Sequence, residues 1–140
     1  GNNWSHKHAR RIWSLKDNPE LRFMALKDFD QDMITLIKRG SVLRYAPTQL
    51  YVSDSQKVLI FGRGRFIFAL NFSPVHSFTD FEFCAPSGEY RIALNTDAKN
   101  YDGFGRIDES VHHFTSRKDG GDKLSLYLPS RSAIVLEKIR

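Results

Sequence analysis

The histidines are the first residues in this sequence whose type and spacing could do chemistry, because imidazole is a common ligand of protein-bound metals. His6 and His8 stand two residues apart, the spacing of a ligand pair on a strand, but no third ligand is evident beside them. His112 and His113 are adjacent, so they would point to opposite faces of a strand. Neither pair predicts a shared metal, and we expect no metal and no cofactor.

Carboxylates are the next candidates, since a retaining glycosidase needs two carboxyl groups about 5 Å apart. Asp80 and Glu82 alternate with apolar residues, which is typical of the solvated face of one strand. The segment from Asp97 to Asp102-Gly103 lacks the alternating oxygen ligands and the distant glutamate of a calcium loop. It predicts a turn, and we expect no catalytic residues in this sequence.

Cys84 is the single cysteine, which excludes an internal disulfide and favours a reducing, cytoplasmic location. No activating neighbour stands beside it, so we expect a structural role. Gly62-Arg63-Gly64 predicts a hairpin and not a phosphate-binding loop, because no helix start follows it.

The net charge of +5 raises nucleic-acid binding as one alternative. The basic pairs Arg10-Arg11, Lys38-Arg39 and Arg117-Lys118 are far apart, however, and the remaining basic residues are interleaved with Asp and Glu. That arrangement is typical of solvated faces, so we expect no nucleic-acid partner. The sequence has neither a long apolar run nor a signal-peptide core, and we expect no membrane partner.

The first third of the sequence has helical periodicity. Asn18-Pro19-Glu20 predicts the helix start, because Asn can cap, Pro suits the first position and Glu complements the dipole. Lys38-Arg39 predicts its last turn, with Gly40 as a left-handed cap. Apolar residues at three- and four-residue spacing form one stripe, which we expect to rest partly on the domain that follows. The stripe comprises Leu21, Ala25, Phe29, Met33, Leu36 and Ile37.

After Ala46-Pro47 the pattern changes to short strands separated by Gly, Pro, Asp and Asn turns. The run 66–70 is continuously apolar, as expected of a strand buried on both faces, and Tyr90, Ile92 and Leu94 are expected to face inward together. About eight strands at this spacing predict a mainly β fold, an antiparallel sandwich or barrel. The expected strands are 49–53, 58–61, 66–70, 78–83, 90–94, 111–116, 124–128 and 134–136.

Several motifs in collinear order carry a family resemblance. Asn71-Phe72-Ser73-Pro74 followed by Ser77-Phe78-Thr79-Asp80-Phe81 resembles the Asn-Phe-His-Pro and Ser-Tyr-Thr-Asp-Tyr segments of 1,4-α-glucan (glycogen) branching enzymes. Phe104 stands where that family commonly has His in a Gly-Gly-His-Xaa-Arg loop. Further segments match in collinear order: Gly1-Asn2-Asn3, His8-Ala9-Arg10-Arg11, Phe29-Asp30, Leu94-Asn95-Thr96-Asp97, Gly103 with Gly105 and Arg106, and Pro129-Ser130-Arg131.

The resemblance implies that residues 1–46 are the helical tail of a (β/α)8 catalytic barrel. Residues 47–140 would then be a β-sandwich of the α-amylase C-terminal type. The parent enzyme would cut α-1,4 linkages of a glucan and form α-1,6 branches, with its catalytic carboxylates upstream of Gly1. The implied partners are this barrel and an α-glucan such as glycogen. Without the barrel, a bare part of the helix stripe would drive self-association.

The same resemblance raises the possibility of glucan contact, because sugar C–H groups stack on exposed aromatic rings. Trp4, Trp13 and Tyr101 are the predicted contact residues, with Trp13 also a candidate for packing between helix and sandwich. Three hypotheses follow. The chain is the noncatalytic end of a branching enzyme, which we favour, an independent glucan-binding module, or a basic β-barrel that binds nucleic acid.

Overall fold

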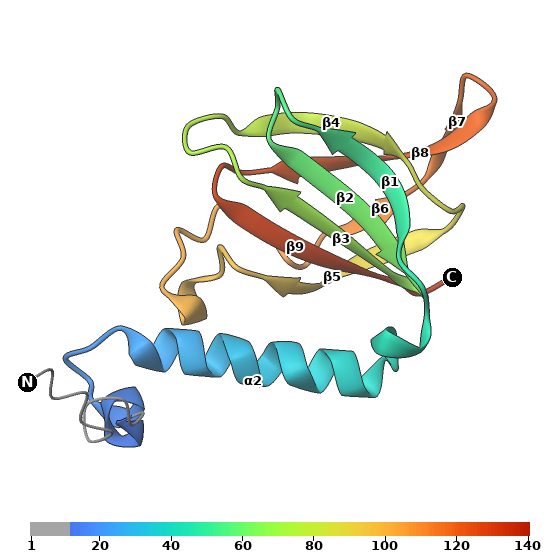
Figure 1. Ribbon diagram of the computed structural model, residues 1–140. Helices are drawn as coiled ribbons and strands as arrows, with labels where there is room; N and C mark the ends of the chain where they lie inside the picture. Colours follow the sequence, from blue (N-terminus) through green and yellow to red (C-terminus); the bar gives the residue numbers. More distant parts are fainter. Residues whose placement is uncertain (1–11) are drawn as a thin grey trace, which may run out of the picture.

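A computed structural model describes residues 12–140, which form a β-sandwich with one long helix against it (Figure 1). The helical elements are η1 (Trp13–Asp17), α2 (Phe23–Arg39), η2 (Val42–Arg44) and η3 (Lys99–Tyr101). The strands are β1 (Thr48–Ser53), β2 (Val58–Arg63), β3 (Phe66–Asn71), β4 (Phe78–Cys84), β5 (Glu89–Asn95), β6 (His112–Phe114), β7 (Ser116–Lys118), β8 (Gly121–Leu128) and β9 (Ser132–Lys138).

The strands form two sheets in which every neighbouring pair is antiparallel. The larger sheet has the order β1-β2-β3-β9-β5-β6 and the smaller one β4-β8-β7. β9, the last of the described strands, therefore lies in the middle of the larger sheet, between β3 and β5. This arrangement confirms the predicted antiparallel β fold.

The main core lies between the two sheets and follows the period-two alternation of their strands. Leu124, Leu126 and Leu128 on β8 face Ile134 and Leu136 on β9 across this layer. The remaining buried members are Val58, Ile60, Ile67, Ala69, Phe81, Phe83, Ala85 and Tyr90.

The outer face of the larger sheet carries a second core, covered by α2 (Figure 1). Leu36 of the helix and Val42 after it pack with Phe66, Leu94 and Val135 of the sheet. β3 thus contributes to both cores, which confirms the prediction from its continuous apolar run. All six residues of the predicted helix stripe are buried or half-buried.

A buried carboxylate joins the helix to this sheet. Glu137 on β9 is only 3% exposed. Its Oε1 accepts hydrogen bonds from Arg39 of α2 at 3.1 Å, and it lies 2.8 Å from the guanidinium of Arg65. Its Oε2 accepts from Arg91 of β5 at 2.7 Å. Burial by itself would raise the pKa of Glu137, but the hydrogen bonds and charges of Arg39 and Arg91 hold it below its ordinary value.

The helix boundaries differ from the prediction at both ends. α2 begins at Phe23, because the Asn18 side chain accepts the Glu20 N–H at 2.9 Å and closes a turn instead of capping a helix. At the other end Gly40 has a right-handed backbone, and Ser41 takes the left-handed position with φ 49°. A Cβ at Gly40 would overlap the ring of Phe66. Glycine is needed there for close approach to the sheet, and the predicted left-handed cap is wrong.

Replacing Gly40 with Ala is therefore expected to lower the free energy of unfolding by about 1–3 kcal/mol, the usual cost of overpacking. The backbone at Gly40 suits alanine, so the loss comes from displacing the Phe66 ring. Gly121→Ala is the matched control, since a Cβ at Gly121 meets nothing within 4 Å. Urea denaturation compares the two variants, and equal stability would contradict the packing argument.

The predicted strand 111–116 is in fact two short strands in different sheets. β6 pairs with β5, and β7 pairs with β8. Thr115 separates them, because its N–H and side chain hydrogen-bond with the backbone of Gly88 and turn the chain between the sheets.

Leu94 also differs from its predicted position. A β-bulge between Ile92 and Leu94 interrupts the alternation on β5. Tyr90 and Ile92 face the core between the sheets, whereas Leu94 packs under the helix. The expectation that all three face one core is therefore wrong for Leu94.

Candidate functional site

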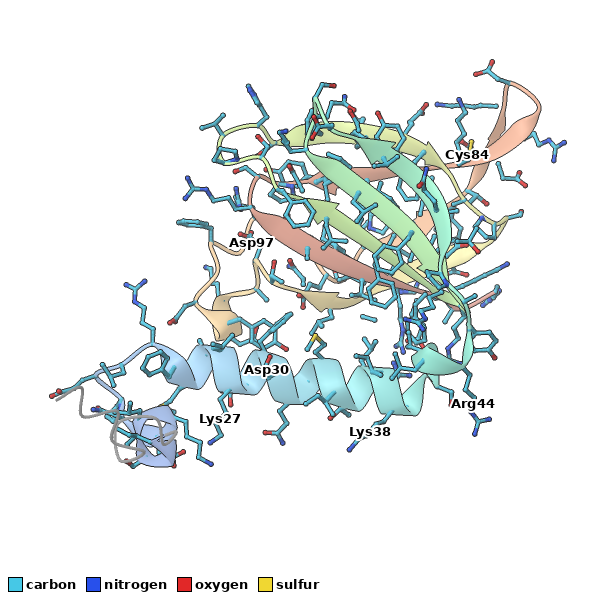
Figure 2. All side chains as sticks on the ribbon, viewed as in Figure 1. Lys27, Asp30, Lys38, Arg44, Cys84 and Asp97 are labelled. Carbon is cyan, nitrogen blue, oxygen red and sulfur yellow. The ribbon has the colours of Figure 1, made fainter. Side chains whose placement is uncertain are left out.

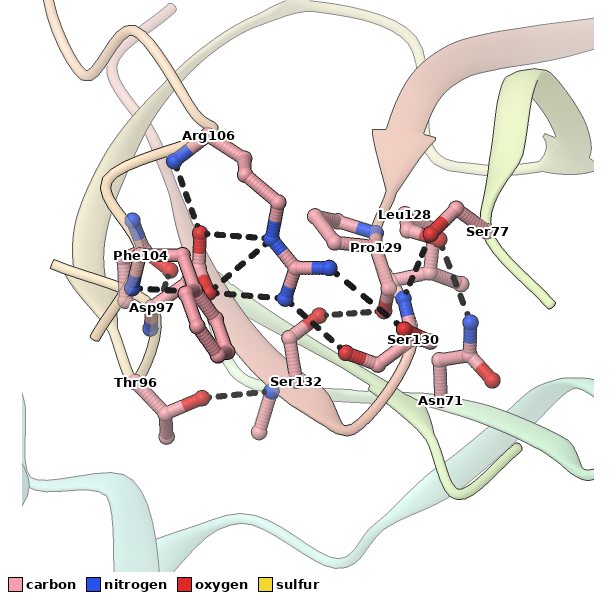
Figure 3. Close-up of polar contacts among 12 residues, drawn as sticks. Asn71, Ser77, Thr96, Asp97, Phe104, Arg106, Leu128, Pro129, Ser130 and Ser132 are labelled. Carbon is pink, nitrogen blue, oxygen red and sulfur yellow. Dashed lines mark hydrogen bonds and ion pairs between the residues drawn. The ribbon is translucent and has the colours of Figure 1, made fainter. Parts of the chain in front are cut away.

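Three loops meet at one end of the sandwich and form a network of polar contacts, which we call the loop cluster (Figure 3). The first runs from Asn71, the last residue of β3, to Ser77, and the second runs from Thr96 to Arg106 after β5. The third is the turn from Pro129, which follows β8, to Ser132, the first residue of β9. Four of the family-like segments found in the sequence thus come together in space.

Asp97 is the buried centre of the loop cluster, with 4% of its surface exposed. Its Oδ1 accepts from Arg106 Nη2 at 2.7 Å, and its Oδ2 accepts the Arg106 backbone N–H at 2.8 Å. The N–H of Phe104 donates to Oδ1 at 3.4 Å. Burial alone would raise the pKa of Asp97, but the hydrogen bonds and charge of Arg106 hold it below its ordinary value. The carboxylate stays ionised and occupied, so it is poorly suited to act as a general acid or nucleophile.

Arg106 extends the network to the other loops. Its Nη2 donates to the Ser130 carbonyl at 3.0 Å and its Nη1 to Ser130 Oγ at 3.4 Å. Its guanidinium carbon lies 5.2 Å from the centre of the Phe104 ring, within cation–π distance. One arginine therefore connects the loop after β5 with the turn before β9 and supports an aromatic ring.

Asn71 ties the loop after β3 to the same cluster. Its Nδ2 donates to the carbonyls of His76 at 2.9 Å and Leu128 at 3.1 Å, while its Oδ1 accepts the Ser73 N–H at 2.9 Å. Ser77 Oγ accepts the Ser130 N–H at 2.9 Å. Both polar side-chain atoms of Asn71 thus have hydrogen-bond partners, which explains how a buried amide is tolerated here.

A pocket of about 650 Å³ opens beside the loop cluster. Phe104 stands at its edge and is 80% exposed. Its other lining residues are Pro74, Thr96, Asp97, Gly103, Arg106, Ser130 and Arg131. The pocket combines one exposed aromatic ring with hydroxyl and guanidinium groups, a combination suited to binding a polar ligand rather than to acid–base chemistry.

The antiparallel β fold agrees with the family that the sequence matches. The family described as "Alpha amylase, C-terminal all-beta domain" matches residues 51–139. This chain belongs to that family. The matched residues hold all nine strands of the described part except the first three positions of β1.

Curated relatives named "1,4-alpha-glucan-branching enzyme" match the α-amylase C-terminal domain and the helix before it. The Dictyostelium discoideum protein is 36% identical over 99% of this chain, and the Saccharomyces cerevisiae protein 37% identical over 94%. The chloroplastic/amyloplastic enzyme of Oryza sativa is 40% identical over 83%. The chain spans only 21%, 20% and 14% of these relatives' own lengths.

One solved structure has a weaker likeness. The cyclomaltodextrin glucanotransferase CldA superimposes with a TM-score of 0.45 and 23% identity, over 78% of this chain and 22% of its own. This likeness is too low to add to the family assignment.

Of the three predicted glucan contacts, the structure describes the side chain of Tyr101 alone. Trp4 and the side chain of Trp13 lie outside the described residues. Tyr101 packs edge-on against Phe29 of α2 at 5.3 Å, and its hydroxyl donates to Asp32. Burial, together with the Asp32 carboxylate, raises the pKa of Tyr101 to about 12. Its role in glucan binding stays a prediction, while its observed contacts join the loop after β5 to the helix.

The other chemically suggestive residues can also be placed. Asp80 and Glu82 are exposed, as predicted, and Glu82 pairs with Lys118. Cys84, predicted to be structural, is exposed on β4 and belongs to neither core.

The adjacent histidines have different surroundings. His112 lies 2.7 Å from Glu89, whereas His113 is half-buried, and burial lowers its pKa. His6 and His8 lie outside the described residues. Within residues 12–140, no group of three His, Cys, Asp or Glu residues is placed to hold a metal ion.

A second feature, missed in the sequence, is an apolar groove on the side of α2 away from the sheets. Its apolar lining residues Phe23, Leu26 and Ile34 are each about half exposed. The ends of two charged side chains, Lys27 and Lys38, lie along the same side (Figure 2). We call this surface the outer groove; it also includes Ile12, Leu15, Lys16, Asp30, Gln31 and Thr35.

The outer groove has a sequence signal of its own. Phe23, Leu26 and Ile34 recur at helical spacing beside the main stripe, so the apolar surface of α2 is wider than one partner requires. Lys27 pairs with Asp17 at 3.1 Å, which holds η1 against the helix at this groove.

In the described part, no helix has the length and hydropathy that a membrane span requires.

Proposed function

We propose that this chain is the noncatalytic C-terminal part of a 1,4-α-glucan branching enzyme. Residues 1–46 would end the catalytic barrel and residues 47–140 would form the domain that packs beside it. The names of relatives at 36–40% identity support this function, and so does the small share of their length that the chain spans. We further propose that the parent enzyme is cytoplasmic and acts on an α-glucan of the glycogen type.

The parent would cut an α-1,4 linkage, hold the glucan as a glycosyl-enzyme and transfer it to a 6-hydroxyl. Retaining chemistry of this kind needs two closely spaced carboxyl groups. In the described part the buried carboxylates Asp97 and Glu137 are both occupied by arginines. We therefore assign catalysis to the rest of the parent and not to residues 12–140.

The outer groove is the observation that carries this proposal. One face of α2 already packs on the sheet, yet Leu26 and Ile34 on its other side remain exposed in a continuous apolar surface. Apolar surfaces of this kind mark contact sites. The occupant we propose is the upstream catalytic part of the same parent chain, because α2 would be the last helix of that part and the relatives are about five times longer than this chain.

A charge in the outer groove of the full-length parent should loosen this contact. Leu26→Lys is expected to cost about 1.5–3 kcal/mol of stability, the value of one buried leucine side chain, and to reduce branching activity after mild heating. Val52→Lys on β1 is the matched control, because Val52 is 57% exposed and Leu26 58%. Thermal unfolding of both variants tests the contact.

The two variants have different expected outcomes. A lower Tm for Leu26→Lys, with Val52→Lys unchanged, supports the docked barrel. Equal and small effects would mean that solvent covers the outer groove in the parent, which would contradict the proposed contact. Absence of α-1,6 branch formation by the unmodified parent would contradict the proposed activity itself.

A further inference from the structure

We propose that Phe104 is a stacking platform for a glucose ring, and that the pocket beside it is a surface site for α-1,4-glucan. This inference rests on the proposed function, because the occupant is the polymer on which the parent would act. It names a residue and a site that differ from the three aromatic residues predicted from the sequence.

The exposure of Phe104 is the first observation. Among the described large apolar residues it is the most exposed, at 80%, although its backbone N–H donates to the buried Asp97. Burying such a ring would remove a large apolar area from water. A ligand with an apolar face would therefore gain more at this position than at a partly covered ring.

The backbone around Phe104 is constrained, which is the second observation. A Cβ at Gly103 would overlap the backbone of Asp97, so the chain passes close to it there. Gly105 has φ +66°, a conformation that glycine adopts without strain. The Phe104 N–H donates to Asp97, and the Arg106 guanidinium lies by its ring. The platform is thus held in place before any ligand binds, which lowers the entropic cost of binding.

The polar groups of the pocket favour a neutral sugar. Thr96 Oγ1 accepts the Ala133 N–H at 2.9 Å, and Ser130 Oγ accepts from Arg106, so both hydroxyl hydrogens can be directed toward a ligand. Arg131 lines the pocket with an exposed side chain that can donate to sugar oxygens. The charge of Arg106 is already balanced by Asp97. An anion would meet that carboxylate, whereas sugar hydroxyls can both donate and accept.

The size of the pocket fits the same ligand. Its volume of about 650 Å³ lies in the usual range for small-molecule sites and exceeds the space needed for one sugar ring. Pro74 and Phe104 supply apolar surface at the pocket, with hydroxyl and guanidinium groups between or beside them. A short segment of glucan could therefore stack one ring on Phe104 while a neighbouring ring contacts the polar residues.

The test uses the full-length parent and compares Phe104→Ala with Phe104→Trp. Affinity electrophoresis in gels containing glycogen measures polymer binding, and branching of short amylose measures the catalytic centre. Loss of one aromatic stacking contact, about 0.5–1.5 kcal/mol, predicts a 2- to 12-fold weaker affinity for Phe104→Ala and recovery in Phe104→Trp. Phe114→Ala is the matched control, since Phe114 is 64% exposed on β6, away from the pocket.

Unchanged glycogen affinity in Phe104→Ala would overturn the platform. So would a lower Tm in Phe104→Ala without any loss of affinity, because the ring would then be a contact between parts of the parent. A parent that forms branches while Phe104→Ala binds normally disproves only this inference. A parent that forms no branches but loses glycogen binding in Phe104→Ala disproves the proposed activity and supports the platform.

Discussion

Replacing Glu137 with Gln is expected to lower the free energy of unfolding by about 1.5–3 kcal/mol, the usual contribution of hydrogen bonds to a charged group. The variant keeps the shape of the side chain and removes its charge. Arg39, Arg65 and Arg91 would then face one another around a neutral amide. Because these arginines come from α2, the β2–β3 hairpin and β5, the loss should separate the helix from the sheet.

The three arginines provide the control for Glu137. Each is about half exposed, so solvent screens its charge and partly replaces its bond with water. Arg65→Ala is therefore expected to cost no more than about 1 kcal/mol. Urea denaturation at neutral pH measures both variants, and a Glu137→Gln loss as small as that of Arg65→Ala would show that the carboxylate is not the centre of this contact.

The pH dependence of the same site has a definite sign. The pKa of Glu137 in the folded protein lies below its ordinary value of 4.5. Its stabilising contribution is therefore complete above pH 4.5 and is lost as the pH falls through the lower, folded value. The unfolding free energy of the unmodified protein should fall in this acidic range, and that of Glu137→Gln should fall less steeply.

Asp97→Asn is expected to have a similar effect, again about 1.5–3 kcal/mol, but at the opposite end of the sandwich. The substitution leaves the Arg106 guanidinium without its counter-ion, and its hydrogen bonds to Ser130 remain. The amide also cannot accept all the hydrogen bonds that the carboxylate accepts from Arg106 and Phe104. Hydrogen exchange should increase first in the segment from Thr96 to Arg106.

A double-mutant cycle separates this pair from general disruption. Because both partners lie in one network, the loss in Asp97→Asn/Arg106→Gln should be smaller than the sum of the two single losses. Additive losses would mean that the ion pair contributes little by itself. The pKa of Asp97 is also below its ordinary 3.8, so its contribution should disappear only as the pH falls below that value.

Local patterns predicted the elements well because the signals come from neighbouring residues. The stripe from Leu21 to Ile37 and the alternation of Leu124, Leu126 and Leu128 each reflect one face of one element. The differences arose where a distant part of the chain decides. The ring of Phe66 leaves no room for a side chain at Gly40, and a bulge opposite β9 redirects Leu94.

The burial of two carboxylates, Glu137 and Asp97, was also not predicted, because distant parts of the chain contribute to each site. Arg39 and Glu137 are 98 positions apart, so no spacing rule connects them. Asp97 belongs to a segment that correctly predicts turns, yet its carboxylate is buried by loops from elsewhere in the chain. Family resemblance marked the segments around Asp97, Arg106 and Ser130, but only the fold showed that they meet.

The outer groove and Phe104 were missed for a different reason. Exposed apolar side chains are common, and a sequence does not show which of them form a continuous surface. The predicted apolar stripe does not include Leu26 or Ile34, and in the sequence Phe104 is only a departure from a family position. Their significance depends on their exposure in the folded chain and on the groove or pocket that each of them lines.

The central position of β9 has a consequence for how the chain is made. On the ribosome, β1–β3 and β5–β6 emerge before the strand that joins them, so each group presents an unpaired edge. Phe66 on β3 pairs with Glu137, which is translated 71 residues later. Until that point the nascent chain is open to pairing with other nascent chains. Translation pauses between β5 and β9 should therefore favour aggregation, and chaperone binding during synthesis should end when β9 emerges.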